Sequence, residues 1–277
     1  MAIAAPDVET SALEADEYRN GLSELWHYRD LLFTLTLHRI RVRYKQSVLG
    51  LGWAVAQPLA QMLILTVVFS HFMRIPSDGL PYSVFVFCSL LPWQFFSSAL
   101  QTGSSCLVSH SDMIRKVGFP REVLPLSYII AGLFDFAITL LVLASMMLWY
   151  QLPFRATILW TLPLMLVAVL LTTALTMGLS AMQARFRDIT YIVPLLLQLG
   201  IYAVPVLYPL SAVPERWRGL YQLNPLVPIV DGFRSAWLKG TSPDMAQLGP
   251  SALVTAVLFV ACYLYFRRVE TTMADYL

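Results

Sequence analysis

The sequence predicts an all-α integral membrane protein with six transmembrane helices. Of its 277 residues, 57% are hydrophobic and only 13% are charged, whereas soluble domains carry about 25% charged residues. Apolar stretches recur along the chain at close to the ~20 residues that a helix needs to cross a bilayer core. We place the six spans at residues 53–73, 82–108, 123–150, 158–182, 189–208 and 251–266.

Residues 1–25 precede the apolar part of the chain and are strongly acidic, with Arg19 as their one basic residue. They lack the basic start and apolar core of a signal peptide, so we expect no cleaved signal. We interpret them as an acidic, disordered cytosolic tail.

Residues 26–52 carry four cations shortly before the first span: Arg39, Arg41, Arg43 and Lys45. The alternation in this short stretch would suit a strand. A longer window favours a helix, because apolar residues recur at helical spacing at Phe33, Leu37, Ile40, Tyr44, Val48 and Leu51. We predict an amphipathic helix and linker on the inner membrane face, either as a surface anchor or as a platform for a cytosolic partner.

The distribution of Lys and Arg predicts the orientation of the spans. Thirteen of the 19 fall on the side that holds both termini, and this side also holds the loop 109–120. Cytoplasmic loops are enriched in Lys and Arg, so both termini are predicted to be cytoplasmic.

The long segment 209–245 falls on the opposite side. Its apolar residues are interrupted by prolines and aromatic rings, a pattern typical of short re-entrant helices shielded by protein. Such helices could form an outer gate, with Trp217, Tyr221 and Phe233 as its side chains; a plain interfacial cap explains the pattern equally well.

Several kinds of chemistry have no motif in this chain. There is no phosphate-binding G-x-x-x-x-G-K-[ST] motif, and the four His and three Cys are too scattered for a metal site or a disulfide framework. Asp135 is the one carboxylate inside the predicted spans, where we expect a helix-packing or channel-facing hydrogen bond. A net charge of +2 does not indicate nucleic-acid binding.

Polar and aromatic side chains within the spans suggest a path for a substrate. Amides suit sugar hydroxyls and aromatic rings suit their C–H faces, although both also serve in helix packing. Pro and Gly interrupt the fifth span, as expected for a helix that bends or lines a cavity. The candidate path residues are Gln57, Gln61, Trp93, Phe95, Phe96, Gln198, Tyr202 and Tyr208.

Several motifs together resemble one family, the permease subunits of type-2 ABC exporters for polysaccharides (O-antigen, capsule and teichoic acid). The resemblance runs from about residue 25 to the end of the chain. It rests on RYKQSVLGLGWAVAQPL (43–59), IRKVGFPREVLPL (114–126), ARFRDITYIVPLLLQ (184–198), PVLYP (205–209), NPLVPIVDGFR (224–234) and FRRVETTMADYL (266–277).

The resemblance implies a homodimer around one path, with two separate cytosolic ATPase subunits that bind the ATP and Mg²⁺, so that this chain itself holds no cofactor. Residues 26–46 would form the interface helix, and the loop 109–120 the coupling helix, with Asp112, Arg115 and Lys116 facing the ATPase. The substrate would be a lipid-linked polysaccharide, most simply O-antigen, crossing a bacterial inner membrane. Its phosphates, or anionic membrane lipids, would meet Arg39, Arg41, Arg43 and Lys45.

Two alternatives stay open at this point. A type-2 permease for a drug or another small molecule would share the architecture. A membrane-bound glycosyl- or acyltransferase would need paired carboxylates or a histidine-based site at the membrane face, and the sequence offers neither.

Overall fold

A computed structural model describes residues 25–45, 49–116 and 118–270. This part of the chain is helical and contains no strand. Five helices are long and apolar enough to cross a membrane: Gly52–Phe72, Tyr82–Ser104, Val123–Trp149, Ala156–Arg185 and Met245–Glu270. The predicted all-α membrane class is therefore confirmed, while the acidic tail (1–24) lies outside the described residues.

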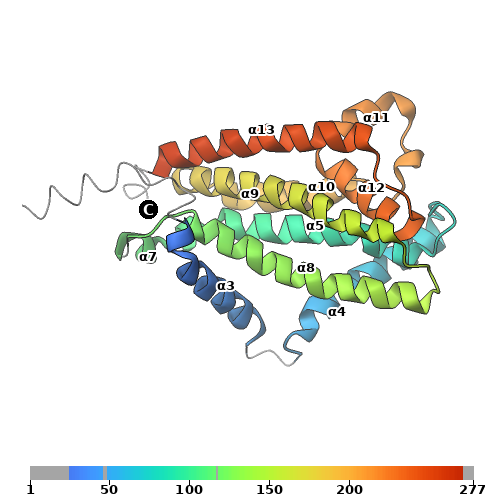
Figure 1. Cartoon of the computed structure of the whole chain (residues 1–277), viewed down its shortest axis with the longest axis horizontal. Helices are drawn as coiled ribbons and strands as arrows, with labels where there is room; N and C mark the ends of the chain where they lie inside the picture. Colours follow the sequence, from blue (N-terminus) through green and yellow to red (C-terminus); the bar gives the residue numbers. More distant parts are fainter. Residues whose placement is uncertain (1–24, 46–48, 117, 271–277) are drawn as a thin grey trace, which may run out of the picture.

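The helix α5 (Tyr82–Ser104) forms the centre of the bundle and is buried along most of its length. It packs against α8 (Val123–Trp149) and α9 (Thr161–Arg185), and α13 (Met245–Glu270) lies along α9 (Figure 1). An α-helix buried on all sides is expected to be apolar around its circumference, and in the first half of α5, from Val84 to Leu91, every residue except Ser89 is apolar. The peripheral helices leave apolar faces exposed, as lipid contact requires.

Several helices differ in detail from the predicted spans. The first span begins as α4 (Gly52–Leu65) and continues as a π-helical segment, η1 (Thr66–Phe72). A 3-10 turn, η2 (Ala156–Trp160), leads into α9. The last span is longer at both ends than the predicted 251–266.

The fifth predicted span is the exception. The helix α10 (Ile189–Ala203) has only 15 residues, a length of about 22 Å against a bilayer core of about 30 Å. It ends because Val204 is extended and Pro205 has no N–H to continue the helix. Five spans are thus established by length, and residues 204–209 continue from α10 as buried, non-helical chain.

The short helices gather at the two ends of the bundle (Figure 1). One end holds α3 (Arg29–Tyr44), α6 (Cys106–Ser109) and α7 (Ser111–Lys116), together with the end of α13. The opposite end holds η3 (Leu210–Ala212), α11 (Glu215–Gln222), α12 (Leu226–Arg234) and η4 (Ser235–Lys239). The two ends therefore separate the predicted coupling loop from the predicted outer segment.

Candidate functional site: a polar cavity within the helix bundle

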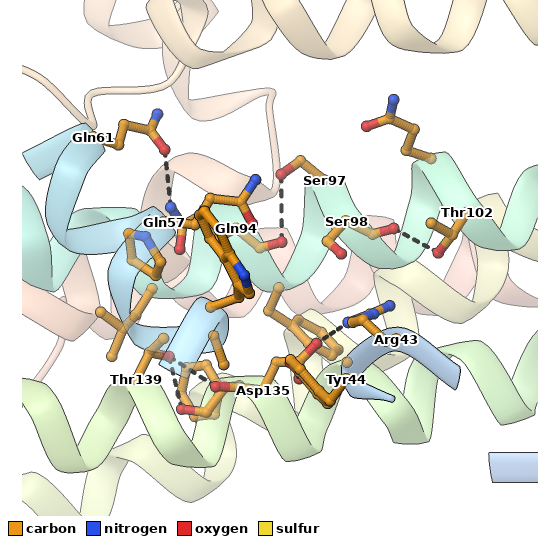
Figure 2. Close-up of a pocket in the computed structure, with 18 residues that line it drawn as sticks. Arg43, Tyr44, Gln57, Gln61, Gln94, Ser97, Ser98, Thr102, Asp135 and Thr139 are labelled. Carbon is orange, nitrogen blue, oxygen red and sulfur yellow. Dashed lines mark hydrogen bonds and ion pairs between the residues drawn. The ribbon is translucent and has the colours of Figure 1, made fainter. Parts of the chain in front are cut away.

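A cavity of about 840 Å³ lies among α3, α4, α5 and α8 (Figure 2). This volume is within the range of small-molecule sites, about 300–1,000 Å³. Its lining is unusually polar for a membrane bundle. The polar members are Arg43, Tyr44, Gln57, Gln61, Gln94, Ser97, Ser98, Gln101, Thr102, Asp135 and Thr139.

One face of α5 supplies much of this lining. Each of Gln94, Ser97, Ser98, Gln101 and Thr102 lies three or four residues from another member of the set, which places them on one side of the helix. These residues were not among those predicted to line a path, although their helical spacing is visible in the sequence. It interrupts an otherwise buried helix because here α5 faces the cavity rather than another helix.

The helix α4 supplies the amides predicted from the sequence. Gln57 and Gln61 both line the cavity, and the amide nitrogen of Gln94 donates to the Gln61 side-chain oxygen at 2.9 Å. The structure thus brings both residues together with the α5 stripe. The amides are left with further donors and acceptors for a ligand.

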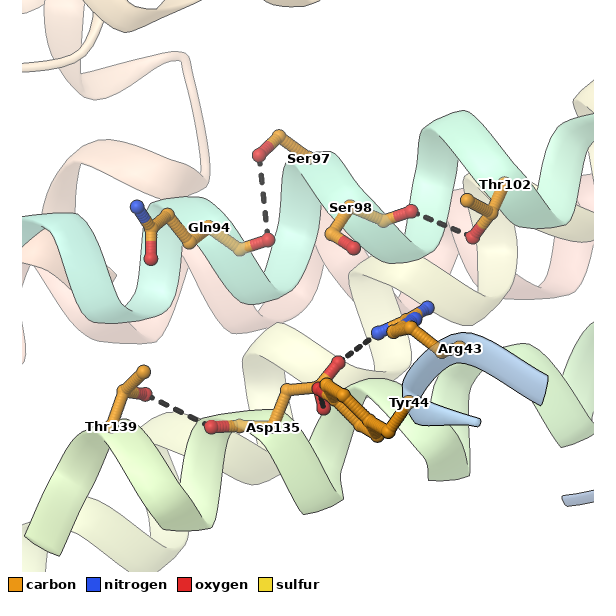
Figure 3. A network of polar contacts seen from close by, with 8 residues as sticks. All are labelled: Arg43, Tyr44, Gln94, Ser97, Ser98, Thr102, Asp135 and Thr139. Atoms are coloured by element: carbon orange, nitrogen blue, oxygen red, sulfur yellow. Dashed lines mark hydrogen bonds and ion pairs between the residues drawn. The ribbon is translucent and has the colours of Figure 1, made fainter. Parts of the chain in front are cut away.

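Asp135 of α8 lies on the side of the cavity opposite α5 and is bound by α3 (Figure 3). The Arg43 guanidinium forms an ion pair with its Oδ2, and the Tyr44 hydroxyl donates to its Oδ1 at 2.5 Å. Burial, followed by the hydrogen bond to Asp135, raises the pKa of Tyr44 to about 12. Both carboxylate oxygens are therefore already engaged, which is how a membrane bundle accommodates a charge.

The helix α3 turns a polar face towards α8, which differs from the predicted arrangement. Arg39 donates through Nε to the Ser127 hydroxyl at 2.7 Å and lies over the Tyr128 ring, 3.4 Å from its centroid. Burial lowers the pKa of Arg39. Of the predicted apolar stripe, Phe33 is 64% exposed, whereas Tyr44 meets α8 beside the cations.

The four predicted cations therefore fall into two pairs. Arg39 and Arg43 bind α8, whereas Arg41 and Lys45 are exposed, and within the described residues neither of them forms an ion pair. Only the second pair is free for a phosphate.

The residues predicted to line a path lie in different parts of the structure. Phe95 lines the cavity. Trp93 and Phe96 lie in the hydrophobic core, with ring centroids 6.0 Å apart. Gln198 and Tyr202 are exposed on α10 and do not line this cavity.

At the opposite end, the Tyr208 and Tyr221 hydroxyls are 2.9 Å apart, and the Tyr208 hydroxyl donates to the Tyr202 carbonyl at 2.8 Å. Trp217 is exposed on α11. Phe233 is fully buried and packs edge-on against Phe136. Of the three predicted gate residues, Tyr221 and Trp217 lie at the surface segment and Phe233 lies in the core.

Arg234 is a buried residue whose role was not predicted from the sequence. It is 1% exposed, donates through Nε to the Ser89 hydroxyl at 2.6 Å and lies over the Phe85 ring. Its Nη1 reaches the Tyr208 carbonyl at 3.3 Å and Asp231 at 3.9 Å. Burial lowers its pKa. Arg234 thus joins α12, α5 and the chain that follows α10.

The predicted coupling residues Asp112, Arg115 and Lys116 are all exposed on α7. They lie at the same end of the bundle as α3 (Figure 1). Within the described residues, no group of His, Cys, Asp and Glu could hold a metal ion.

Sequence comparison with known proteins indicates the family of this chain. The ABC-2 type transporter family model matches residues 30–238. An O-antigen export system permease protein, RfbA, of Myxococcus xanthus is 35% identical over 255 residues, covering 91% of this chain and 97% of that protein.

Relatives of lower identity are also named for polysaccharide transport. An RfbA of Klebsiella pneumoniae is 31% identical and covers 76% of this chain and 82% of that protein. The polysialic acid transport protein KpsM of Escherichia coli is 25% identical and covers 87% of this chain and 94% of that protein. The family match spans most of the chain and five helices are long and apolar enough to cross a membrane, so this integral membrane protein belongs to the ABC-2 type transporter family.

Proposed function

We propose that this chain is the transmembrane subunit of an ATP-driven exporter that moves a lipid-linked polysaccharide, an O-antigen, across the bacterial cytoplasmic membrane. The names of its relatives support a polysaccharide. The observation that carries the proposal is the polar cavity, where amides and hydroxyls lie beside the rings of Trp53, Phe95 and Phe136. This combination serves the hydroxyls and the C–H faces of sugar rings.

The working assembly in this proposal is a homodimer with two cytosolic ATPase subunits, which bind ATP and Mg²⁺. The exposed apolar side chains of α4 and α10, among them Leu63, Ile64, Leu195 and Leu199, support burial against lipid or a second copy. Residues 204–209 would complete a sixth span begun by α10, and the segment 209–245 would be re-entrant. Both termini would then be cytoplasmic.

Movement would enter the bundle through α7 and α3. Since Arg39 and Arg43 fasten α3 to α8, a displacement of α3 by the ATPase would move one wall of the cavity. ATP binding does such work only if the ATPase prefers one of the two arrangements of this chain.

The lipid phosphates would meet α3 outside the cavity. Arg41 and Lys45 are exposed there, and Arg forms bidentate contacts with phosphate. Arg39 and Arg43 would instead transmit movement.

Deleting the gene in its host and fractionating lipid-linked glycans by membrane side tests the proposal. We expect full-length glycan on the cytoplasmic face and none at the surface, restored by the wild-type gene but less so by a Gln94→Ala, Gln101→Ala variant. The matched control is Gln151→Ala, an exposed glutamine outside the cavity. Normal surface glycan in the deletion strain would overturn the proposal in favour of a small-molecule permease.

A further inference from the structure

The cavity contains a balanced pair of charges and otherwise only neutral groups. Among the described residues that line it, Arg43 and Asp135 are the charged ones, and they are bound to each other. Tyr44 occupies the second carboxylate oxygen. A ligand in the cavity therefore meets a lining of no net charge.

From this balance we infer that the cavity accepts stretches of glycan built from uncharged sugars and rejects acidic ones, with the Arg43–Asp135 pair as the determinant. The inference rests on the proposed function and adds the substrate's charge class. Neutral hydroxyls exchange their hydrogen bonds with water for bonds to Gln57, Gln94 and Ser98 at little cost. A carboxylate loses its hydration and finds no free cation, because Arg43 is already paired.

The pair also gives acidic sugars no net attraction. The Arg43 side chain is 33% exposed and the Asp135 side chain 23%, so neither charge is fully hidden from the cavity. A carboxylate that approaches the pair meets Asp135 as well as Arg43, and repulsion from the Asp135 carboxylate offsets the attraction of the cation. The lipid phosphates are not affected, since Arg41 and Lys45 lie outside the lining.

The test compares four versions of the full chain that differ in the net charge of the cavity lining. The wild type has zero, Asp135→Asn has plus one, Arg43→Gln has minus one, and the double variant Arg43→Gln, Asp135→Asn returns to zero. The control is Asp30→Asn, the same change at a side chain 96% exposed and outside the cavity. Each protein is purified in nanodiscs, and folding is checked by its thermal unfolding midpoint.

The probes are a neutral glucose oligomer and a sialic acid oligomer of matched length, and their binding is measured by calorimetry. We expect the wild type and the control to bind the neutral oligomer about tenfold more tightly, the effect of ~1.4 kcal/mol from one charge contact. Asp135→Asn should remove the preference for the neutral oligomer, and Arg43→Gln should increase it. The double variant should show the same preference as the wild type.

If the wild type binds the acidic oligomer as tightly as the neutral one, or more tightly, the inference is wrong, but the proposed function as a glycan exporter still stands. A preference for the neutral oligomer that stays unchanged across all four versions would also overturn it. Binding of neither oligomer to any version would remove the cavity as a glycan site, and with it the main support for the proposed function.

Discussion

Arg39 and Arg41 lie two residues apart on α3 but have different surroundings. Arg39 binds Ser127 and Tyr128, whereas Arg41 is exposed. A hydrogen bond from a charged group contributes about 1.5–3 kcal/mol, and a cation over an aromatic ring about 1 kcal/mol. The two arginines differ in their contacts because Arg39 lies one helical turn from Arg43, on the face of α3 that meets α8, and Arg41 does not lie on that face.

Replacing Arg39 with Gln should therefore lower stability by about 2 kcal/mol, seen as a lower thermal unfolding midpoint of the purified protein. Arg41→Gln should leave the midpoint unchanged and weaken binding to vesicles containing anionic lipid. Equal effects of the two substitutions on stability would contradict the assigned geometry.

Arg234 provides a second test at the residue scale. Arg234→Gln would leave the Ser89 hydroxyl and the Tyr208 carbonyl without their charged partner in a buried site. We expect a loss of about 3 kcal/mol, with increased protease cleavage near residues 209–225. Ser89→Ala should cost about 1 kcal/mol, since it removes one hydrogen bond and retains the cation.

Close helix packing between α5 and α10 depends on a glycine. A Cβ at Gly200 would lie 2.7 Å from Cη2 of the Trp93 ring. Gly200→Ala should therefore destabilise the protein by about 1–3 kcal/mol through overpacking. Trp93→Phe removes the clashing atoms, so the double variant should be more stable than the sum of the single changes predicts, as measured in a double-mutant cycle.

The length of α10 leads to a topology prediction at the scale of elements. If residues 189–209 cross the membrane, an alkaline phosphatase reporter fused after Arg187 should be inactive, and one fused after Glu215 should be active. Activity at neither site would mean that α10 enters the membrane and returns, and that the chain has five spans.

The sequence predicted the helices more fully than the site. Long apolar runs predict spans because a bilayer demands them, and five of the six were confirmed by the helices found. The predicted pair Gln57 and Gln61 lines the cavity. The partners of Asp135 could not be predicted, because Arg43 lies 92 residues away and only the packing of α3 on α8 brings the two together.

The aromatic residues show a related limit. Trp93, Phe96 and Phe233 have the residue type expected of a path or a gate, yet each is buried in the core of the bundle. Residue type does not reveal which side of a helix faces a cavity when both sides are apolar. The polar stripe on α5 is the clearer signal in the sequence, because polar groups in a bundle need a partner or a cavity, but its residues were not among the predicted path residues.

At the scale of the whole molecule, the two ends of the bundle would perform separate tasks. The exposed Arg115 and Lys116 lie on α7, at the same end of the bundle as α3 and at the opposite end from α11 and α12 (Figure 1). An ATPase docked on α7 would also be near α3, whose Arg43 reaches the cavity through Asp135. Coupling would thus need only a short chain of contacts, from α7 and α3 to the cavity wall.

Reversing the charges in Arg115→Glu, Lys116→Glu should separate assembly from transport. These side chains are exposed, so the variant should fold and insert normally, but the altered electrostatics should weaken ATPase docking at low salt. We expect surface glycan to be lost and less ATPase to co-purify with the chain. The control Arg74→Glu reverses an exposed charge elsewhere on the chain and should retain both. Normal co-purification and normal export by the charge-reversed variant would show that α7 is not the docking site, and would leave α3 as the element through which the ATPase acts.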